Sequence, residues 1–376
     1  MKVAVIGGGP AGLYFAYLLK RAHAGADIRI FEQNRADATF GFGVVFSDRA
    51  LEFLRDDDPE TCDHITPHME IWNDLTVVHE DQPIRIDGVG FAAIGRLEFL
   101  KLLQERVQSV GLEPEFETPV TSLDDLDEFD LIIGADGVNS MTRGACDQLF
   151  GTTVTPLRNK FIWYGTSKPF DTLTQTFRRN EHGAFNAHHY RYAPDKSTFI
   201  VETNPDTWRR AGFEHMDERQ TMAYCARVFA AELNGHPLIS NKSIWRNFPN
   251  VWNSRWSHGN IVLLGDALRT AHFSIGSGTR LAMEDAIALV AALVECRDDL
   301  SAALQLYEAR RRPIVEKLVS AANQSAAWYQ DFADHMALPP WDLAHSYARR
   351  TGRVSEQRLA QLAPRFMARY TARLVN

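Results

Sequence analysis

Two glycine-rich segments about 250 residues apart constrain this chain more than any other feature. The first is VIGGGPAG at Val5–Gly12, and the second is LLGDALRTAHFSIGSGTR at Leu263–Arg280. Glycine lets a backbone turn tightly and lets another group approach it closely. Each segment alone is ambiguous, but together they indicate one extended ligand that is held at both ends.

The first segment predicts a strand, a tight turn and the start of a helix. Lys2–Ile6 is typical of a buried strand, and Leu13–Arg21 continues with the apolar period of a helix. Between them, Gly7, Gly9 and Gly12 form GxGxxG. Gly7 permits the turn, Gly9 lets a pyrophosphate approach, and Gly12 allows the helix to pack closely on the strand. The alternative is a tight turn that binds no ligand.

An acidic residue at the end of the next strand favours the dinucleotide interpretation. The strand is Asp27–Phe31, and Glu32 follows it directly, 20 residues after Gly12. This is near the spacing at which a carboxylate accepts hydrogen bonds from a ribose diol. The sequence therefore predicts a nucleotide-containing cofactor at this loop.

Composition and charge exclude several classes of function. The chain has 376 residues, of which 45% are hydrophobic, which suits a large core and two interleaved domains. Its net charge of −8 argues against a general nucleic-acid binder. An anionic substrate would therefore need a local basic patch.

Neither a membrane span nor a disulfide framework is expected. The most apolar stretch, Leu281–Leu293, is interrupted by Glu284 and Asp285. A strand that begins at residue 2 leaves no room for a signal peptide. The cysteines are far apart, form no CxxC and suggest reduced thiols in the cytoplasm, with no metal site. They are Cys62, Cys146, Cys225 and Cys296.

The pattern along the chain predicts an α/β protein with a Rossmann-like dinucleotide-binding domain and an interleaved antiparallel or mixed sheet. The alternating runs FIWYGTS, FNAHHYRY and STFIVET indicate strands with one buried face. The predicted ranges are 1–70, 93–155 and 255–330 for the cofactor domain, 71–92 and 156–254 for the sheet domain, and 331–376 for a C-terminal helical segment. Further expected elements are a helix at Arg96–Val110, a strand at Asp130–Ile133, a helix at Arg219–Leu233, a strand at Ile261–Leu264, and helices from about Gly278, at Gln305–Trp328 and at Trp341–Leu374.

Two further motifs follow predicted strands. GADGVNSMTR places Asp136 where it can accept from a ribose or ribityl hydroxyl, although Asp-Gly is also a common turn pair. Asp266 ends the later strand, and Gly276 and Gly278 introduce the next helix. The free amides of that helix would stabilise the negative charge of a reduced flavin at N1 and O2.

The order of these motifs resembles the single-component FAD-dependent aromatic hydroxylases, the group A flavoprotein monooxygenases, over nearly the whole chain. The shared features are GxGxxG, a helix beginning at Arg96, GADGxxSxxR and GDA followed by GxG. The resemblance implies tightly bound, non-covalent FAD, with NADH or NADPH as a transient reductant and O2 as the oxidant. The FAD contacts that it implies are Gly7, Gly9, Pro10, Ala11, Gly12, Glu32, Gln33, Gly43, Val44, Arg96, Asp136, Asp266, Gly276, Gly278, Thr279 and Arg280.

Departures from the family pattern narrow the subgroup. Arg269, Phe273 and Arg280 stand where His, Pro and Asn are common. GDALRTAHFSIGSGT, FGFGVVFSD and WDLAHSYARRTGRVS resemble the salicylyl-CoA 5-hydroxylase and aminobenzoyl-CoA monooxygenase branch. The violacein-pathway tryptophan hydroxylases share GDAL, HFSIG and YGTS.

The resemblance implies hydroxylation of an aromatic acyl-CoA at C5, para to a ring hydroxyl or amine, through a flavin C4a-hydroperoxide. The alternatives are the same chemistry on a free aromatic or indole compound and, more distantly, a flavin- or NAD-binding regulator without activity. The expected partner is this small molecule, with neither nucleic acid nor membrane, and the expected state is a monomer or homodimer.

Candidate catalytic and substrate-binding residues lie on both predicted domains. His188 and His189 point to opposite faces of a strand, so at most one faces a pocket, and a structural histidine is the alternative. His272 and Arg269 lie on the loop expected next to the flavin.

Aromatic and basic residues complete the predicted substrate site. Phe42 and Phe273 are expected to flank the aromatic ring. The segment 341–376 has seven arginines and two acids, a net charge of +5. A solvated helix face is one interpretation. A patch for the CoA phosphates, formed by Arg349, Arg350 and Arg353, is the other.

Overall fold

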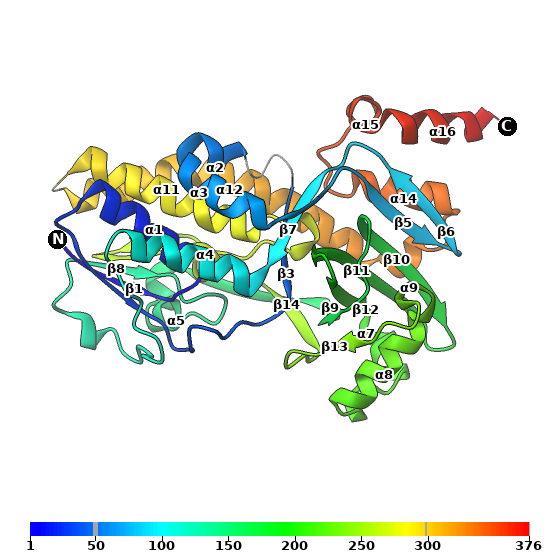
Figure 1. The fold of residues 1–376 in the computed structure, drawn as a ribbon, viewed down its shortest axis with the longest axis horizontal. Coiled ribbons are helices and arrows are strands. Elements are labelled where there is room, and N and C mark those ends of the chain that lie inside the picture. The colour runs from blue at the N-terminus through cyan, green and yellow to red at the C-terminus, as the bar shows by residue number, and fades with distance from the viewer. Residues whose placement is uncertain (48–51, 298, 376) are drawn as a thin grey trace.

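The structure, a computed structural model, describes residues 1–47, 52–297 and 299–375. One residue of the glycine-rich text FGFGVVFSD and one residue of the predicted C-terminal segment lie outside the described residues. They are Asp48, which ends the glycine-rich text, and Asn376 of the C-terminal segment. The molecule has two halves, with helix α12 (Leu300–Gln330) passing from one to the other (Figure 1).

The first half is built on a five-stranded sheet that is parallel except at one edge. Its order is β15-β16-β8-β1-β2, and only the β15–β16 pair is antiparallel. Helix α1 packs against α11 and α4 beside this sheet. The strands are β1 (Lys2–Ile6), β2 (Asp27–Phe31), β8 (Leu131–Gly134), β15 (Ser257–His258) and β16 (Ile261–Leu263).

The second half is built on an eight-stranded mixed sheet. Its main path is β13-β9-β12-β11-β10-β5-β6, with β14 paired to the long strand β9. A three-stranded antiparallel sheet, β3-β7-β4, lies between the two halves. The strands are β3 (Gly43–Ser47), β4 (Glu70–Trp72), β5 (Leu75–His79), β6 (Gln82–Ile86), β7 (Phe91–Gly95), β9 (Thr152–Thr166), β10 (Leu173–Asn180), β11 (Gly183–Ala193), β12 (Lys196–Thr203), β13 (Leu238–Ile239) and β14 (Arg246–Asn253).

Helices cover both sheets, and the C-terminal ones lie against the second half (Figure 1). In the N-terminal part they are α1 (Pro10–Ala22), α2 (Glu52–Asp57), α3 (Pro59–Ile65), α4 (Arg96–Ser109), α5 (Met141–Ala145), α6 (Asp147–Phe150), α7 (Pro205–Arg210), α8 (Glu218–Val228) and α9 (Ala230–Leu233). The later ones are α10 (Gly265–Leu268), α11 (Gly278–Cys296), α13 (Phe332–His335), α14 (Pro340–Arg349), α15 (Glu356–Leu362) and α16 (Pro364–Val375).

The predicted fold class is confirmed, and the differences lie at element boundaries. Helix α1 begins at Pro10 rather than Leu13, because proline suits the first helical turn, where no backbone donor is needed. The helix expected at Arg219–Leu233 is interrupted at Phe229. The range Trp341–Leu374 lies in three helices, α14, α15 and α16, since Gly352 and Pro364 separate them.

Helix α12 joins the two hydrophobic cores. Tyr307 and Val315 are buried in the core of the five-stranded half, whereas Trp328 and Tyr329 are buried in the core beneath the mixed sheet. Because one continuous helix packs in both cores, it fixes the distance between the cofactor loops and the mixed sheet. No described helix is long and apolar enough to cross a membrane.

Candidate functional site

The loop after β1 has the backbone geometry of an anion-binding turn. Gly7 has φ +113°, and a Cβ atom at Gly12 would overlap the Gly7 carbonyl oxygen. Gly9, the residue before α1, faces open space, and no side chain caps the helix. The amides at the start of α1, which include those of Ala11 and Gly12, are therefore available to a pyrophosphate.

Glu32 organises this loop. Its Oε2 accepts a hydrogen bond from the Gly8 amide at 2.7 Å, and its Oε1 accepts from the Asn34 amide at 2.8 Å. The neighbouring Gln33 is exposed. The carboxylate thus lies beside the glycine turn, and its contact with a ribose stays a prediction.

Asp136 and Arg143 stabilise the loops after β8 and β16. Asp136 accepts hydrogen bonds from the Ser140 hydroxyl at 2.6 Å and from the Thr142 amide at 3.0 Å. Arg143 donates to the Val138 carbonyl at 2.6 Å and to the Ala267 carbonyl at 3.0 Å. Arg143 ends the motif GADGVNSMTR, but its link to the second loop depends on tertiary structure and was not predicted.

Arg96 and Asp266 are two nearby groups of opposite charge beside the loops expected to bind the cofactor. Burial lowers the pKa of Arg96, and the nearby Asp266 partly offsets this effect. The Asp266 side chain remains accessible, yet the surrounding protein raises its pKa, and Arg269 and Arg96 oppose the rise. Among the described residues, no hydrogen-bond partner is found for either side chain. Both groups therefore fit polar atoms of a bound FAD.

Helix α11 presents a second free N-terminus. No side chain caps it at Ser277, and Gly276 before it has φ +61°. The neighbouring Thr279 lies in its first turn, while Arg280 donates to Glu284 at 2.7 Å. The predicted flavin contacts of this loop are thus grouped at one helix terminus.

The predicted ring contacts Gly43 and Val44 lie in β3, next to the mixed sheet. The Gly43 amide donates to Thr198 Oγ1 at 2.9 Å, and its carbonyl accepts from Tyr190 Oη at 2.9 Å. A Cβ atom at Gly43 would contact Tyr192. Glycine is therefore required here for close packing, which joins this loop to β11 and β12.

Arg269 lies in a buried ionic network. Its side chain is 1% exposed and donates to the Gly265 carbonyl at 2.8 Å and to Asp285 Oδ2 at 2.7 Å. Arg311 donates to the other oxygen, Oδ1, at 3.0 Å. These contacts favour a structural role for Arg269, not the catalytic role predicted from the sequence.

Phe273 lies at the centre of an aromatic wall between the two halves. Its ring centroid is 5.1 Å from that of Phe161 on β9, 4.2 Å from that of His272 and 6.5 Å from that of His188. Phe42 packs over Gly165, where a Cβ atom would overlap its ring. Both predicted ring-flanking residues therefore contact β9 of the mixed sheet.

His272 belongs to a hydrogen-bonded chain that reaches the C-terminal segment. Its Nδ1 lies 2.8 Å from Ser274 Oγ, which lies 2.7 Å from Ser325 Oγ on α12. Arg350 donates to Ser325 Oγ at 3.1 Å and to the Ser274 carbonyl at 2.8 Å. Arg350, predicted as a phosphate contact, is directed into the protein.

His188 and His189 lie on opposite faces of β11, as strand alternation predicts. His189 contacts Thr176 Oγ1 at 3.0 Å and stacks on Phe199, with centroids 5.0 Å apart. His188 contacts Tyr190 and Phe273 instead. Of the two, only His188 faces the aromatic wall.

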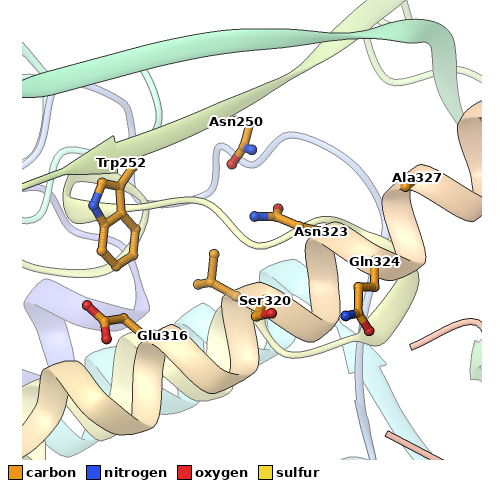
Figure 2. Close-up of a pocket in the computed structure, with 8 residues that line it drawn as sticks. Asn250, Trp252, Glu316, Ser320, Asn323, Gln324 and Ala327 are labelled. Carbon is orange, nitrogen blue, oxygen red and sulfur yellow. The ribbon is translucent and has the colours of Figure 1, made fainter. Parts of the chain in front are cut away.

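The other two arginines of the predicted phosphate patch are exposed. Arg349 pairs with Glu356 at 2.6 Å, and Arg353 lines a groove of about 540 Å³ with Lys317. A neighbouring groove of about 510 Å³ lies between β14 and α12, and Figure 2 shows the polar side chains that face it. Glu316, Ser320 and Gln324 line both grooves. In the part of the chain that the structure describes, no group of three or more His, Cys, Asp or Glu residues could hold a metal ion.

Comparison with known proteins establishes the class to which this fold and site belong. The FAD binding domain family matches residues 1–130 and 128–322, and the chain belongs to this family. The resemblance to the FAD-dependent aromatic hydroxylases is confirmed, and FAD is the cofactor.

Three relatives narrow the comparison. Salicyloyl-CoA 5-hydroxylase of Streptomyces sp is 44% identical over 344 residues, which are 89% of this chain and 66% of that protein. The 3-hydroxy-4-methyl-anthranilyl-[aryl-carrier protein] 5-monooxygenase of Streptosporangium sibiricum is 36% identical, over 96% of this chain and 97% of the relative. Protodeoxyviolaceinate monooxygenase of Chromobacterium violaceum is 37% identical, over 92% of this chain and 94% of the relative.

Solved structures share the fold. 2-Methyl-3-hydroxypyridine-5-carboxylic acid oxygenase superposes with a TM-score of 0.72 at 17% identity, covering 96% of each chain. P. aeruginosa PqsL in complex with 2-aminobenzoylacetate superposes with a TM-score of 0.68 at 20% identity, covering 88% of this chain and 97% of that one.

The buried titratable groups predict loss of stability in acid. Burial lowers the pKa of His188 and of His272 to about 3, from 6.5. As the pH falls below 6.5, the unfolded chain gains protons that the folded chain does not, which costs about 1.4 kcal/mol per pH unit for each histidine. Glu202 opposes this trend, because burial raises its pKa to about 8 from 4.5. His189, whose pKa is also lowered by burial, adds to the loss, whereas the raised pKa of Asp266 opposes it. The three buried histidines outweigh the two acids, so the free energy of unfolding should fall between pH 6.5 and 4.5.

Urea denaturation at these two pH values checks the prediction. His188→Gln should flatten the pH dependence, since one of the buried histidines with a lowered pKa is removed. His215→Gln is the control, because the His215 side chain is 83% exposed. Equal slopes for wild type and His188→Gln would contradict this account.

Proposed function

We propose that the protein is an FAD- and NAD(P)H-dependent monooxygenase that hydroxylates an aromatic acyl-CoA at C5, para to a ring hydroxyl or amine. The observation that carries the proposal is the 44% identity to salicyloyl-CoA 5-hydroxylase over 344 residues. The matched residues are 66% of that relative's length. A second relative, at 36% identity, also carries a 5-monooxygenase name and acts on an aryl group held by a carrier protein.

One group of residues binds FAD, and another positions the aromatic ring of the substrate. The amides at the starts of α1 and α11, together with Arg96 and Asp266, hold the cofactor. Once reduced by NAD(P)H, FAD supplies the chemistry that transfers one atom of O2 to the ring. The wall formed by Phe161 and Phe273 excludes water and orients the substrate.

The para position follows from the electronics of the ring. A hydroxyl or amine donates electron density to the carbon para to itself, which for a 2-substituted benzoyl thioester is C5. His188 and His272 remain neutral at pH 7, because burial lowers both pKa values to about 3. They therefore act as hydrogen-bonding groups and not as charged acids.

A free aromatic or indole substrate is the second candidate. The relative that favours it is protodeoxyviolaceinate monooxygenase, at 37% identity over 92% of this chain. In either case the four cysteines are unpaired, which supports a reducing, cytoplasmic location.

A direct assay separates the two candidates. The purified holoenzyme should oxidise NADH with salicyloyl-CoA and form a product 16 Da heavier, but should leave free salicylate and tryptophan unchanged. Mass spectrometry identifies the product, and a catalase control quantifies hydrogen peroxide. Hydroxylation of a free acid or of an indole, with none of the thioester, would favour the second candidate and overturn the first.

The CoA phosphates are proposed to bind beside Lys317 and Arg353. The two cations line one groove, and no ion pair is found for either among the described residues. Lys317→Ala/Arg353→Ala should raise KM for salicyloyl-CoA by about three- to tenfold, because two phosphate contacts are lost, and should leave kcat unchanged.

The short thioester salicyloyl-N-acetylcysteamine provides the internal control, since it lacks the nucleotide phosphates. Its KM should be the same for wild type and the double variant. Arg209→Ala removes an exposed arginine on the mixed-sheet half that pairs with Asp206. This variant should change neither the KM for salicyloyl-CoA nor the KM for the short thioester. An unchanged KM for salicyloyl-CoA in the double variant would exclude this groove.

A further inference from the structure

One face of the mixed sheet carries three buried polar side chains, Gln175, His188 and Glu202, here called the polar trio. Gln175 on β10 is directly opposite His188 on β11, and Glu202 on β12 is opposite Asn186 of β11. Because Asn186 and His188 are two residues apart, the trio shares one face of the sheet. The three residues are 0%, 3% and 3% exposed.

Most polar atoms of the trio have no hydrogen-bond partner among the described residues. These atoms are both amide atoms of Gln175, both ring nitrogens of His188 and Oε2 of Glu202. The one contact is from Asn159 Nδ2 to Glu202 Oε1, at 2.9 Å. Unpaired buried polar groups cost free energy, so five such atoms on one face require a physical reason.

The trio lies on the side of the sheet that faces the cofactor loops. His188 contacts Phe273, which follows the Asp266 motif, and the charge of Arg350 helps to lower the pKa of His188. Burial is the largest cause of the raised pKa of Tyr329 on α12, and the nearby Glu202 makes a smaller contribution in the same direction. The polar atoms therefore lie between the sheet, the loop 272–275 and α12.

On the basis of the proposed function, we propose that Gln175, His188 and Glu202 determine substrate specificity. Glu202 binds the carbonyl oxygen of the aryl thioester, while Gln175 and His188 bind the ring hydroxyl or amine ortho to it. This assigns a binding role to three side chains, of which only His188 stands out in the sequence.

The hydrogen-bonding capacity of the trio matches these two groups. Burial raises the pKa of Glu202 to about 8, so at pH 7 its carboxyl is neutral and its free oxygen can donate to a carbonyl. Gln175 offers both a donor and an acceptor, and neutral His188 offers one of each. A ring hydroxyl or amine needs an acceptor, which Gln175 or His188 provides.

The charge of the site also favours a thioester over a free carboxylate. The trio carries no positive charge at pH 7. The Arg350 guanidinium, the cation beside it, already donates to Ser325, to the Tyr347 carbonyl and to the Ser274 carbonyl. A carboxylate would therefore lose its hydration without gaining a free cationic partner.

The test compares the binding of two thioesters to the oxidised holoenzyme. Salicyloyl-CoA has the ortho hydroxyl and benzoyl-CoA lacks it, and the change in FAD absorbance on titration gives each Kd. The variants are Gln175→Leu, Glu202→Leu and the conservative Glu202→Gln. Thr203→Val is the matched control, because Thr203 is the buried neighbour of Glu202 on the opposite face. FAD content and Tm of each variant verify folding.

Gln175→Leu should raise the Kd of salicyloyl-CoA about tenfold and leave that of benzoyl-CoA unchanged. Glu202→Leu should raise both Kd values about tenfold, and Glu202→Gln should restore binding because its amide also donates. Thr203→Val should match wild type.

A structural defect in Gln175→Leu would weaken the binding of salicyloyl-CoA and of benzoyl-CoA equally. An unchanged ratio of the two Kd values therefore overturns the inference. Wild-type affinity in Glu202→Leu overturns it as well. If wild type binds neither thioester, the proposed function fails and this inference fails with it. If wild type discriminates between the ligands and the variants do not alter that discrimination, only the inference fails.

Discussion

The cofactor half of the protein depends on the buried carboxylate of Asp285. Its oxygens accept hydrogen bonds from Arg269, from Arg311 and from the Gly265 amide at 3.3 Å. These partners lie on the Asp266 loop and on α12, so one side chain of α11 joins three segments. Glu284 beside it pairs with Arg280 and Arg311, which extends the network to the start of α11. A buried charge without these partners would be strongly destabilising.

The network has a consequence for the substrate side of the site. It fixes the loop that carries His272 and Phe273, while the same helix α12 continues to Ser325, which bonds Ser274 and Arg350. The loop is therefore held at one end by Asp285 of α11 and at the other end by Ser325 of α12. The aromatic wall and the polar face of the mixed sheet keep a fixed separation because α12 packs in both cores.

The sequence predicts the cofactor loops well, because their determinants are local. Gly7 and Gly12 are required by the turn itself. Asp136 lies two residues after the end of β8, and Asp266 lies three residues after the end of β16, in the short helix α10. The substrate side is less accessible to sequence reasoning. Glu202 is one of several polar residues in the strand STFIVET. Its neighbour Tyr329 lies on α12, more than a hundred residues later in the chain.

The two arginines that the sequence assigns to function illustrate the same limit. Arg269 replaces a residue common in the family, and this change alone suggests chemistry, but its partner Asp285 is known only from the fold. Arg350 belongs to an arginine-rich segment that suggests phosphate binding, yet it is directed inward to Ser274. Ionic partners far apart in sequence decide the role of each residue, and spacing does not reveal them.

The most direct test of this account is the effect of Asp285→Asn on FAD binding and stability. The variant should lose about 3–5 kcal/mol of unfolding free energy, because two buried guanidinium groups lose their shared anion, and its Kd for FAD should rise. Glu295→Gln, which breaks the exposed pair with Arg310, should change stability by less than about 1 kcal/mol. Wild-type FAD affinity and stability in Asp285→Asn would contradict the central role given to this carboxylate.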